Sequence, residues 1–167
     1  MTGHAVTLGP AVSPADMDAV KSLFRDYVGS LGFDLGFQDI DAEMADFPGK
    51  YAPPGGALLL ARIDGATAGA VALRDLDDGI CEMKRLYVRP EARGHGLGRR
   101  LIERLIVEAG ARGYRAMRLD TVPRHHDEAI ALYRGFGFRE IAPYCHNPLP
   151  GALFMELTLG GTVVSGA

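Results

Sequence analysis

The stretch from Ile80 to Gly110 constrains the fold most, because a strand pattern gives way to a helix pattern across a loop rich in glycine and arginine. Residues 80–88, ICEMKRLYV, have the composition of a strand. From Leu97 onward, apolar residues recur at three- and four-residue spacing, which predicts an amphipathic helix ending near Gly110 to Gly113. The joining sequence, RPEARGHGLGRRL, therefore leads from a strand into a helix N-terminus, as loops of α/β proteins do.

This loop has the properties of an anion-binding site. A helix N-terminus carries unpaired backbone N–H groups and a partial positive charge, and glycine lets a ligand approach the backbone closely. Between Lys84 and Arg104 the chain carries seven lysines and arginines against two acids, whereas the whole chain has a net charge of −3. This contrast predicts a site for a pyrophosphate, with a turn that carries solvated arginines as the alternative.

Two well-known phosphate-binding loops do not fit this stretch. The P-loop requires G-x-x-x-x-G-K-[ST], and the chain has no such motif. The dinucleotide fingerprint requires G-x-G-x-x-G, whereas the glycines here are Gly94, Gly96 and Gly98. A nucleotide-phosphate enzyme of the P-loop kind is therefore disfavoured.

Length and composition exclude other classes. The 167 residues suffice for one domain with a core, and we expect a single domain over residues 1–160 with a flexible tail over 161–167. The net charge of −3 gives no support for a nucleic-acid or membrane-surface role, and no apolar stretch reaches the roughly 18 residues of a membrane span. Two cysteines make no disulfide framework, and without a signal-peptide pattern we expect a cytoplasmic protein.

The other elements predict a mixed sheet flanked by helices. Asp64-Gly65 between two strand-like runs is typical of a hairpin turn, and Ser13 is placed to cap the first helix. The expected order is β-α-α-β-β-β-α-β-α-β-β, an α/β fold. Strands are expected at 5–9, 57–63, 66–76, 80–88, 114–122, 138–140 and 151–159, and helices at 13–32, 37–47, 97–110 and 125–137.

Two motifs resemble one known family. RGHGLG (93–98) matches the [RQ]-x-x-G-x-[GA] loop of the GCN5-related N-acetyltransferases, the GNAT family, and AIALYRGFGF (129–138) resembles their A-x-x-L-Y-x-x-x-G-F motif. The resemblance extends over residues 57 to 159, and the N-terminal third fits only in its element order. It implies the acyl-CoA N-acyltransferase fold with a centrally splayed sheet, acetyl-CoA as cosubstrate, and no metal.

The resemblance also places the coenzyme. The backbone of the strand before the loop would pair with pantetheine, and the N–H groups of the loop would hold the pyrophosphate. His126 stands where many family members have Asn, so its role is left open. The expected coenzyme-binding residues are Leu86, Tyr87, Val88, Arg93, Gly94, His95, Gly96, Leu97, Gly98, Arg99 and His126.

Two residues are expected to transfer protons. An alkylammonium with a pKa near 10.4 must lose a proton before it attacks a thioester, so a base is needed. Glu82 stands 11 residues before Arg93, the spacing of the catalytic glutamate in histone-acetylating members, and strand alternation puts it on one face with Lys84 and Leu86. The alternatives are a water chain, or a structural glutamate paired with Lys84 or an arginine. Tyr133 matches the tyrosine that protonates the leaving thiolate, with a core aromatic as its alternative.

The acceptor is expected over the opening of the sheet, against Phe33, Tyr51, Tyr144, His146 and Asn147. The loop that holds the last three is also readable as a plain turn system, and Cys145 as an acyl-carrying nucleophile is a further alternative. The acidic residues between positions 34 and 46 are readable as an attraction for a cationic acceptor or as a solvated helix face. A metal pair of adjacent histidines, 125 and 126, is disfavoured because adjacent side chains point apart.

These features predict an N-acetyltransferase that moves the acetyl group of acetyl-CoA directly to a primary amine of a small molecule. A protein or peptide N-acetyltransferase and a non-catalytic acyl-CoA-binding sensor are the alternatives. We expect no nucleic-acid or membrane partner, and a homodimer is left open.

Overall fold

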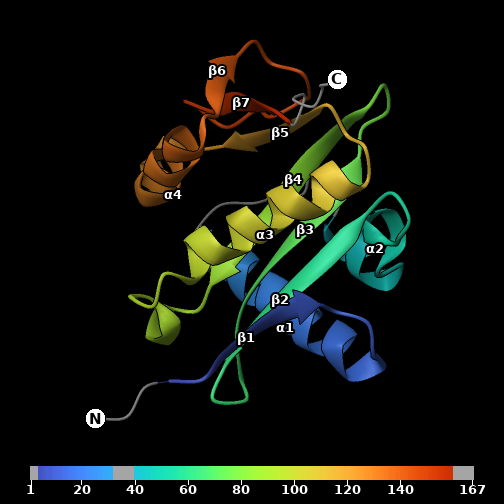
Figure 1. The fold of residues 1–167 in the computed structure, drawn as a ribbon. Coiled ribbons are helices and arrows are strands. Elements are labelled where there is room, and N and C mark those ends of the chain that lie inside the picture. Colours follow the sequence, from blue (N-terminus) through green and yellow to red (C-terminus); the bar gives the residue numbers. More distant parts are fainter. Residues whose placement is uncertain (1–3, 32–39, 160–167) are drawn as a thin grey trace.

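The computed structural model describes residues 4–31 and 40–159, apart from the side chains of residue 31 and residues 123–126 (Figure 1). The expected tail at 161–167 and the acceptor candidate Phe33 lie outside these residues. Seven strands form one sheet in the order β1-β2-β3-β4-β5-β7-β6. The strands are β1 (Val6–Pro10), β2 (Ala57–Ile63), β3 (Ala66–Asp75), β4 (Ile80–Val88), β5 (Ala116–Thr121), β6 (Arg139–Ile141) and β7 (Leu153–Thr158).

The helices follow the predicted order along the chain. They are α1 (Pro14–Leu31), α2 (Ile40–Ala45), α3 (Leu97–Ala111) and α4 (Pro123–Phe136), with short 3-10 turns η2 (Gly49–Tyr51) and η3 (Pro90–Ala92) in predicted loops. The predicted α/β class and strand–helix order are confirmed. In the described part of the chain, none of the helices combines the length and apolar character that a membrane span requires.

Local interactions explain where the elements begin and turn. The Ser13 hydroxyl accepts a hydrogen bond from the Asp16 N–H at 3.0 Å, and the Asp16 carboxylate accepts one from the Ser13 N–H at 3.4 Å, so the two residues cap α1 reciprocally. Asp64 and Gly65 have positive φ angles of 51° and 84°, which a tight hairpin between β2 and β3 requires. The expected cap and hairpin are both confirmed.

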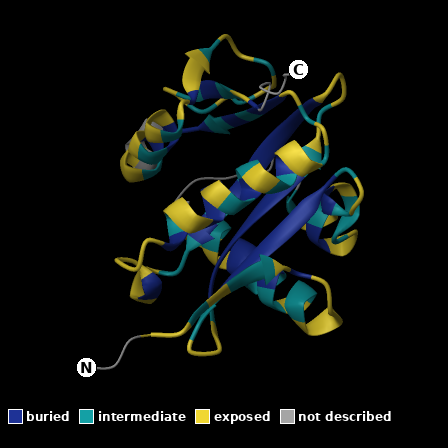
Figure 2. Cartoon of the chain, in the orientation of Figure 1, coloured by how far each residue is buried: buried dark blue, intermediate teal, exposed yellow. Residues whose placement is uncertain are grey.

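Helices cover both faces of the sheet and bury two apolar clusters. On one face, Leu101, Ile102 and Leu105 of α3 pack on β2 to β5. On the other face, Val20, Leu23 and Phe24 of α1 pack on β2 and β3, together with α2 and η2. Figure 2 shows the same division along α3, where buried residues line the sheet side and exposed residues line the outer side. We call the α1/α2 side of the sheet the acceptor face.

Strand β4 contains a bulge that changes the predicted facing of its side chains. Ala70 of β3 lies opposite Tyr87, but Ala72 lies opposite Lys84, so one residue of β3 is matched by two of β4. Arg85 takes the extra position with a φ of 63°. Simple alternation predicted Leu86 on the face of Glu82 and Lys84, and this is wrong: Leu86 packs into the α3-side cluster with Met83 because the bulge shifts the alternation by one residue.

The sheet opens between β4 and β5. These two strands are parallel and pair at only three positions, the last of which joins Glu82 to Arg118. Beyond that pair, β5 continues to Thr121 and β4 to Val88, but the two strands no longer pair with each other. On its other edge, β5 pairs with β7 along its whole length. The two halves of the sheet therefore diverge, as Figure 1 shows, and the splayed sheet that was predicted is present.

Candidate active site

The divergence of β4 and β5 leaves a pocket in the middle of the sheet. It is lined by Met83 to Leu86 of β4, by Leu119 to Thr121 of β5, and by the side chains of Tyr27, Ala129 and Tyr133 from α1 and α4. Backbone groups on both strand edges have no strand partner here, so this opening can accept an extended ligand by hydrogen bonding.

The exposed edge of β4 leads from this pocket toward the glycine loop. The Arg89 N–H donates to the Ala68 carbonyl of β3 at 2.8 Å, so the backbone groups of Val88 and Leu86, on alternate positions, point to the opening. Arg93 donates from Nε to the Val88 carbonyl at 3.2 Å, which ties the start of the loop to this edge. Tyr87 instead faces α1, where its ring lies 5.9 Å from that of Tyr27.

The glycine loop presents bare backbone at the N-terminus of α3. Gly94 and Gly96 have positive φ angles of 91° and 71°, and a Cβ added at either would meet nothing within 4 Å. Gly96 is the N-cap of α3, and no side chain caps the helix there. The first N–H groups of α3 therefore have no side-chain cap and lie beside open glycine backbone, which fits an anion such as a pyrophosphate.

The side chains around this loop are held by neighbours. Leu97, the first residue of α3, is buried in the core cluster. Gly98 lies close to Leu132 of α4, since a Cβ at Gly98 would be 3.6 Å from the Leu132 Cδ1. The Arg99 guanidinium lies 5.3 Å from the centre of the Phe136 ring. The His95 ring packs edge-on to His4 at 5.2 Å. These contacts fix the loop without occupying its backbone donors.

Tyr133 reaches the pocket from α4. It is buried, and its ring lies 5.7 Å from that of Phe138. Burial, with smaller effects from Tyr27 and Asp120, raises the pKa of Tyr133 above its usual value. The phenol therefore keeps its proton at neutral pH and is able to donate it.

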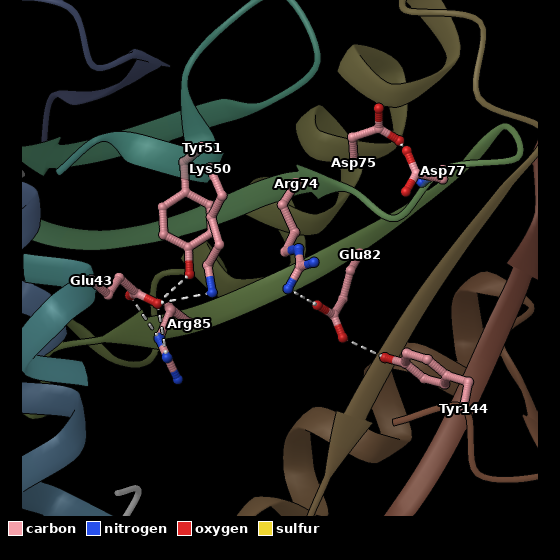
Figure 3. Close-up of polar contacts among 9 residues, drawn as sticks. All are labelled: Glu43, Lys50, Tyr51, Arg74, Asp75, Asp77, Glu82, Arg85 and Tyr144. Atoms are coloured by element: carbon pink, nitrogen blue, oxygen red, sulfur yellow. Dashed lines mark hydrogen bonds and ion pairs between the residues drawn. The ribbon is translucent and has the colours of Figure 1, made fainter. Parts of the chain in front are cut away.

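Glu82 lies where the two strands separate, with 2% of the residue exposed. One carboxylate oxygen accepts a hydrogen bond from the Tyr144 hydroxyl at 2.6 Å, and the other lies 3.7 Å from an Nη of Arg74 (Figure 3). Burial and the Glu82 carboxylate raise the pKa of Tyr144 well above its usual value, so this phenol is the hydrogen-bond donor. Glu82 is thus a buried carboxylate with two partners, one of them an arginine.

The loop between β6 and β7 spans the divergence. Tyr144 bonds Glu82 of β4, and Asn147 donates from Nδ2 to the Asp120 carboxylate of β5 at 2.9 Å. The Cys145 thiol lies between them, within 4.8 Å of a carboxylate oxygen of each. Partial burial, then the charges of Asp120 and Glu82, raise the pKa of Cys145 to about 11. The thiol is therefore protonated at neutral pH and is a poor nucleophile.

A second polar cluster supports the acceptor face. Arg85, whose side chain is 2% exposed, donates two hydrogen bonds to Glu43 of α2, at 3.2 and 3.1 Å. Tyr51 donates its hydroxyl to the same carboxylate at 2.9 Å, and the Lys50 ammonium lies 3.3 Å from it (Figure 3). Burial would raise the pKa of Glu43, but Arg85, Lys50 and Tyr51 together hold it below its usual value.

Comparison with known proteins agrees with this geometry. The sequence pattern of the acetyltransferase (GNAT) family matches residues 18–138. An uncharacterised N-acetyltransferase of Schizosaccharomyces pombe is 42% identical over 156 residues, which cover 92% of this chain and 95% of that protein. The chain belongs to the GNAT family. It is an N-acetyltransferase, as the sequence motifs predicted.

Two other similarities bear on this GNAT acetyltransferase. The structure of an acetyltransferase of Salmonella typhimurium with its cofactor acetyl-CoA superimposes with a TM-score of 0.72 at 24% identity, over 98% of this chain and 99% of that one. The N-acetylaspartate synthetase of Rattus norvegicus is 33% identical over 114 residues, which cover 67% of this chain and 38% of that protein. The first supports the fold, and the second is a relative whose name states its product.

The acceptor residues predicted for this acetyltransferase occupy different environments. Tyr144 and Asn147 lie at the divergence of the strands, and His146 is exposed beside them. Tyr51 is 1% exposed and packs within the acceptor face, with its ring among those of Phe24 and Phe47 and its hydroxyl on Glu43, so a ligand cannot contact it directly. Phe33 and the side chain of His126 lie outside the described residues.

Sequence reasoning missed several residues of this GNAT site. Arg74 and Asp120 were not singled out, and neither was the ion pair of Glu43 with Arg85. Asp120 could have been predicted from the sequence, because it is a charged residue near the carboxyl end of β5, the strand that borders the opening. Arg74 was not, because only the pairing of β3 with β4 sets it opposite Glu82.

Proposed function

We propose that this acetyltransferase moves the acetyl group of acetyl-CoA directly to the primary amine of a small molecule. The observation that carries the proposal is the pair of carboxylates, Glu82 and Asp120, at the parting of β4 and β5 beneath the 144–147 loop. A loop bonded to both strands narrows the acceptor side, which favours a compact amine over a folded protein chain. The relative named N-acetylaspartate synthetase has a small acetylated amino acid as its product, which supports this substrate class.

The residues suit direct transfer. Acetyl-CoA supplies the thioester, and the amine nitrogen forms a bond to its carbonyl carbon while the carbon–sulfur bond breaks. Glu82, directly or through water, takes the proton that the amine loses, and the Tyr133 phenol gives a proton to the departing sulfur. Holding both reactants at one opening replaces a bimolecular encounter by a reaction between neighbours. The high pKa of Cys145 disfavours an acyl-cysteine route.

The test is a comparison of acceptors under one set of conditions. Purified protein is incubated with acetyl-CoA and a panel of small primary amines, and with lysine- and N-terminal-amine peptides. Release of CoA gives the rate, and mass spectrometry identifies the acetylated product. We expect turnover with members of the small-amine panel. Faster turnover with peptides would favour a peptide acetyltransferase, and acetyl-CoA binding without any turnover would favour the sensor.

A further inference from the structure

Three cations gather on the acceptor face beside Glu82: Arg74 of β3, Lys84 of β4 and Lys50 of η2. Arg74 lies opposite Glu82 in the register of β3 and β4, and Lys84 follows Glu82 by two positions on the same face. Figure 3 shows Arg74 and Lys50 extending over β4 on the side of Glu82. Burial lowers the pKa of Lys50, the Glu43 carboxylate opposes this, and the charges of Lys84 and Arg74 lower it further. The three cations are therefore close enough to repel one another.

Arg74 has donors that no described residue uses. Its 3.7 Å contact with Glu82 is an ion pair that is too long for a hydrogen bond. Its Nε is buried and has no hydrogen-bond partner within the part of the chain described. An orphaned buried donor on a charged group is costly, so such a group is typical of a site that a ligand completes. Arg85 shows the contrast, because Glu43 accepts two of its hydrogen bonds.

Lys84 is a second cation whose donors no described residue uses in an ion pair. It lines the pocket at the divergence of the strands, and it has no ion pair with any residue in the described ranges. The nearby carboxylates already accept hydrogen bonds from other residues: Glu82 from Tyr144, Asp120 from Asn147, and Glu43 from Arg85. Beside Glu82 there are thus an Arg74 guanidinium whose buried Nε has no hydrogen-bond acceptor and a Lys84 ammonium with no ion pair, both among the described residues.

We propose that the acceptor is a small amine that carries a carboxylate close to its nitrogen, as free amino acids do, and that Arg74 and Lys84 bind that carboxylate. This inference rests on the proposed function and names its substrate class. The guanidinium of Arg74 suits a carboxylate because its N–H groups form a planar fork. With the carboxylate on Arg74, the attached nitrogen falls beside Glu82, which lies next to Arg74. The site thereby matches both charges of an amino acid.

This arrangement opposes one expectation from the sequence. The acidic stretch at 34–46 left open an attraction for a cationic acceptor. In the described part of that stretch, Glu43 is neutralised by Arg85 and Lys50, and Asp41 and Asp46 are exposed. Among the described residues next to Glu82, the groups left to bind a ligand are the cations Arg74 and Lys84, which favours an anionic group on the acceptor.

The experiment compares matched acceptors on matched variants. Each amino acid is assayed beside its own amide, which keeps the amine and removes the carboxylate, and beside an aminoalkyl phosphate. The variants are Arg74→Gln and Lys84→Gln, with Arg62→Gln as control. The Arg62 side chain is 32% exposed, close to the 31% of Arg74, so the two arginines are matched in exposure. The ion pair of Arg62 with Asp16 lies away from the pocket. Acetyl-CoA binding by calorimetry verifies that each variant is folded.

We expect wild type and Arg62→Gln to favour the acid over the amide by about tenfold or more in kcat/KM, the effect of a hydrogen bond to a charged group. The amide has the more easily deprotonated amine, so this preference would oppose intrinsic reactivity. Arg74→Gln should bring the ratio close to one by lowering kcat/KM for the acid more than for the amide, because both acceptors also lose the ion pair of Arg74 with Glu82. Lys84→Gln should lower the ratio partly.

Other results separate the two proposals. If no amine is acetylated, the proposed function fails. If amides and acids react equally in wild type, or if Arg74→Gln slows both by the same factor, the carboxylate inference is overturned and acetyl transfer to small amines stands. A clear preference for the aminoalkyl phosphate would also overturn it, since the site would then be one for phosphate.

Discussion

The proposed coenzyme side of the opening is one continuous stretch of chain, whereas the proposed acceptor side consists of side chains from segments far apart in the sequence. The coenzyme side is formed by backbone groups between Leu86 and Arg99, and glycines at 94 and 96 make these groups accessible. The acceptor side is formed by Arg74, Glu82 and Asp120, together with α2 and the 144–147 loop. A backbone-built site tolerates changes of side chain but not of conformation, while a side-chain-built site can change its ligand by single substitutions.

The largest effect should come from Glu82, where the acceptor side meets the chemistry. Glu82→Gln removes the base but keeps an acceptor for the Tyr144 hydroxyl, so kcat/KM should fall about 10³-fold while acetyl-CoA binding is retained. Steady-state kinetics and calorimetry measure the two quantities. Glu108→Gln on α3, which breaks the 2.8 Å ion pairs with Arg104 and Arg112, is the control. Near-normal activity of Glu82→Gln would mean that a water chain carries the proton.

The next effect concerns the buried ion pair behind the acceptor face. Glu43→Gln leaves the Arg85 guanidinium buried without its counter-charge, so the free energy of unfolding should fall by about 3 to 5 kcal/mol at neutral pH. The folded state lowers the pKa of Glu43 below 4.5, so its contribution is complete above that pH and is lost as pH falls through the folded pKa. Urea unfolding between neutral and acid pH should show this loss in wild type and a flatter dependence in the variant. Equal acid sensitivity of both would contradict it.

The coenzyme side should respond to backbone change instead. Gly96→Glu puts a side chain at a φ of 71° and a negative charge at the N-terminus of α3, so acetyl-CoA should bind about 100-fold more weakly. Calorimetry with acetyl-CoA, CoA and ATP measures this. Gly110→Glu, at a glycine with open space and no positive φ in the same helix, serves as control. Unchanged binding in Gly96→Glu would place the pyrophosphate elsewhere.

The smallest effect should be at Cys145, which lies between two carboxylates yet has no role in direct transfer. Cys145→Ser should change kcat by less than about twofold, and the thiol should react slowly with iodoacetamide near pH 8, because its pKa is about 11. A severe loss of activity, or a trapped acetyl-cysteine in wild type, would support an acyl-enzyme route instead.

The comparison also explains what the sequence could predict. The shape of the proposed coenzyme side could be predicted because its residues are consecutive and depend on local structure: a strand, a loop that needs positive φ, and a helix start. The contacts of the proposed acceptor side could be predicted only in part. Glu82 and Tyr144 were named separately, but their 2.6 Å contact joins residues 62 positions apart. Arg74 enters the site through strand register, which no local pattern reports.

The bulge could not be predicted for a related reason. Arg85 has no feature that favours a positive φ, and its conformation is held by the buried pairing with Glu43 on another element. A tertiary contact thus overrides local preference, and the facing predicted for Leu86 failed with it.

That bulge divides β4 into two segments that run out of phase with each other. Before it, even-numbered side chains such as Lys84 lie on the acceptor face; after it, even-numbered residues such as Leu86 belong to the α3-side core. Removing one residue at the bulge would restore regular alternation along β4. The side chains on one side of the deletion would then move to the opposite face of the sheet. Substitutions on the strand before the bulge therefore leave the facing of the strand edge after it unchanged.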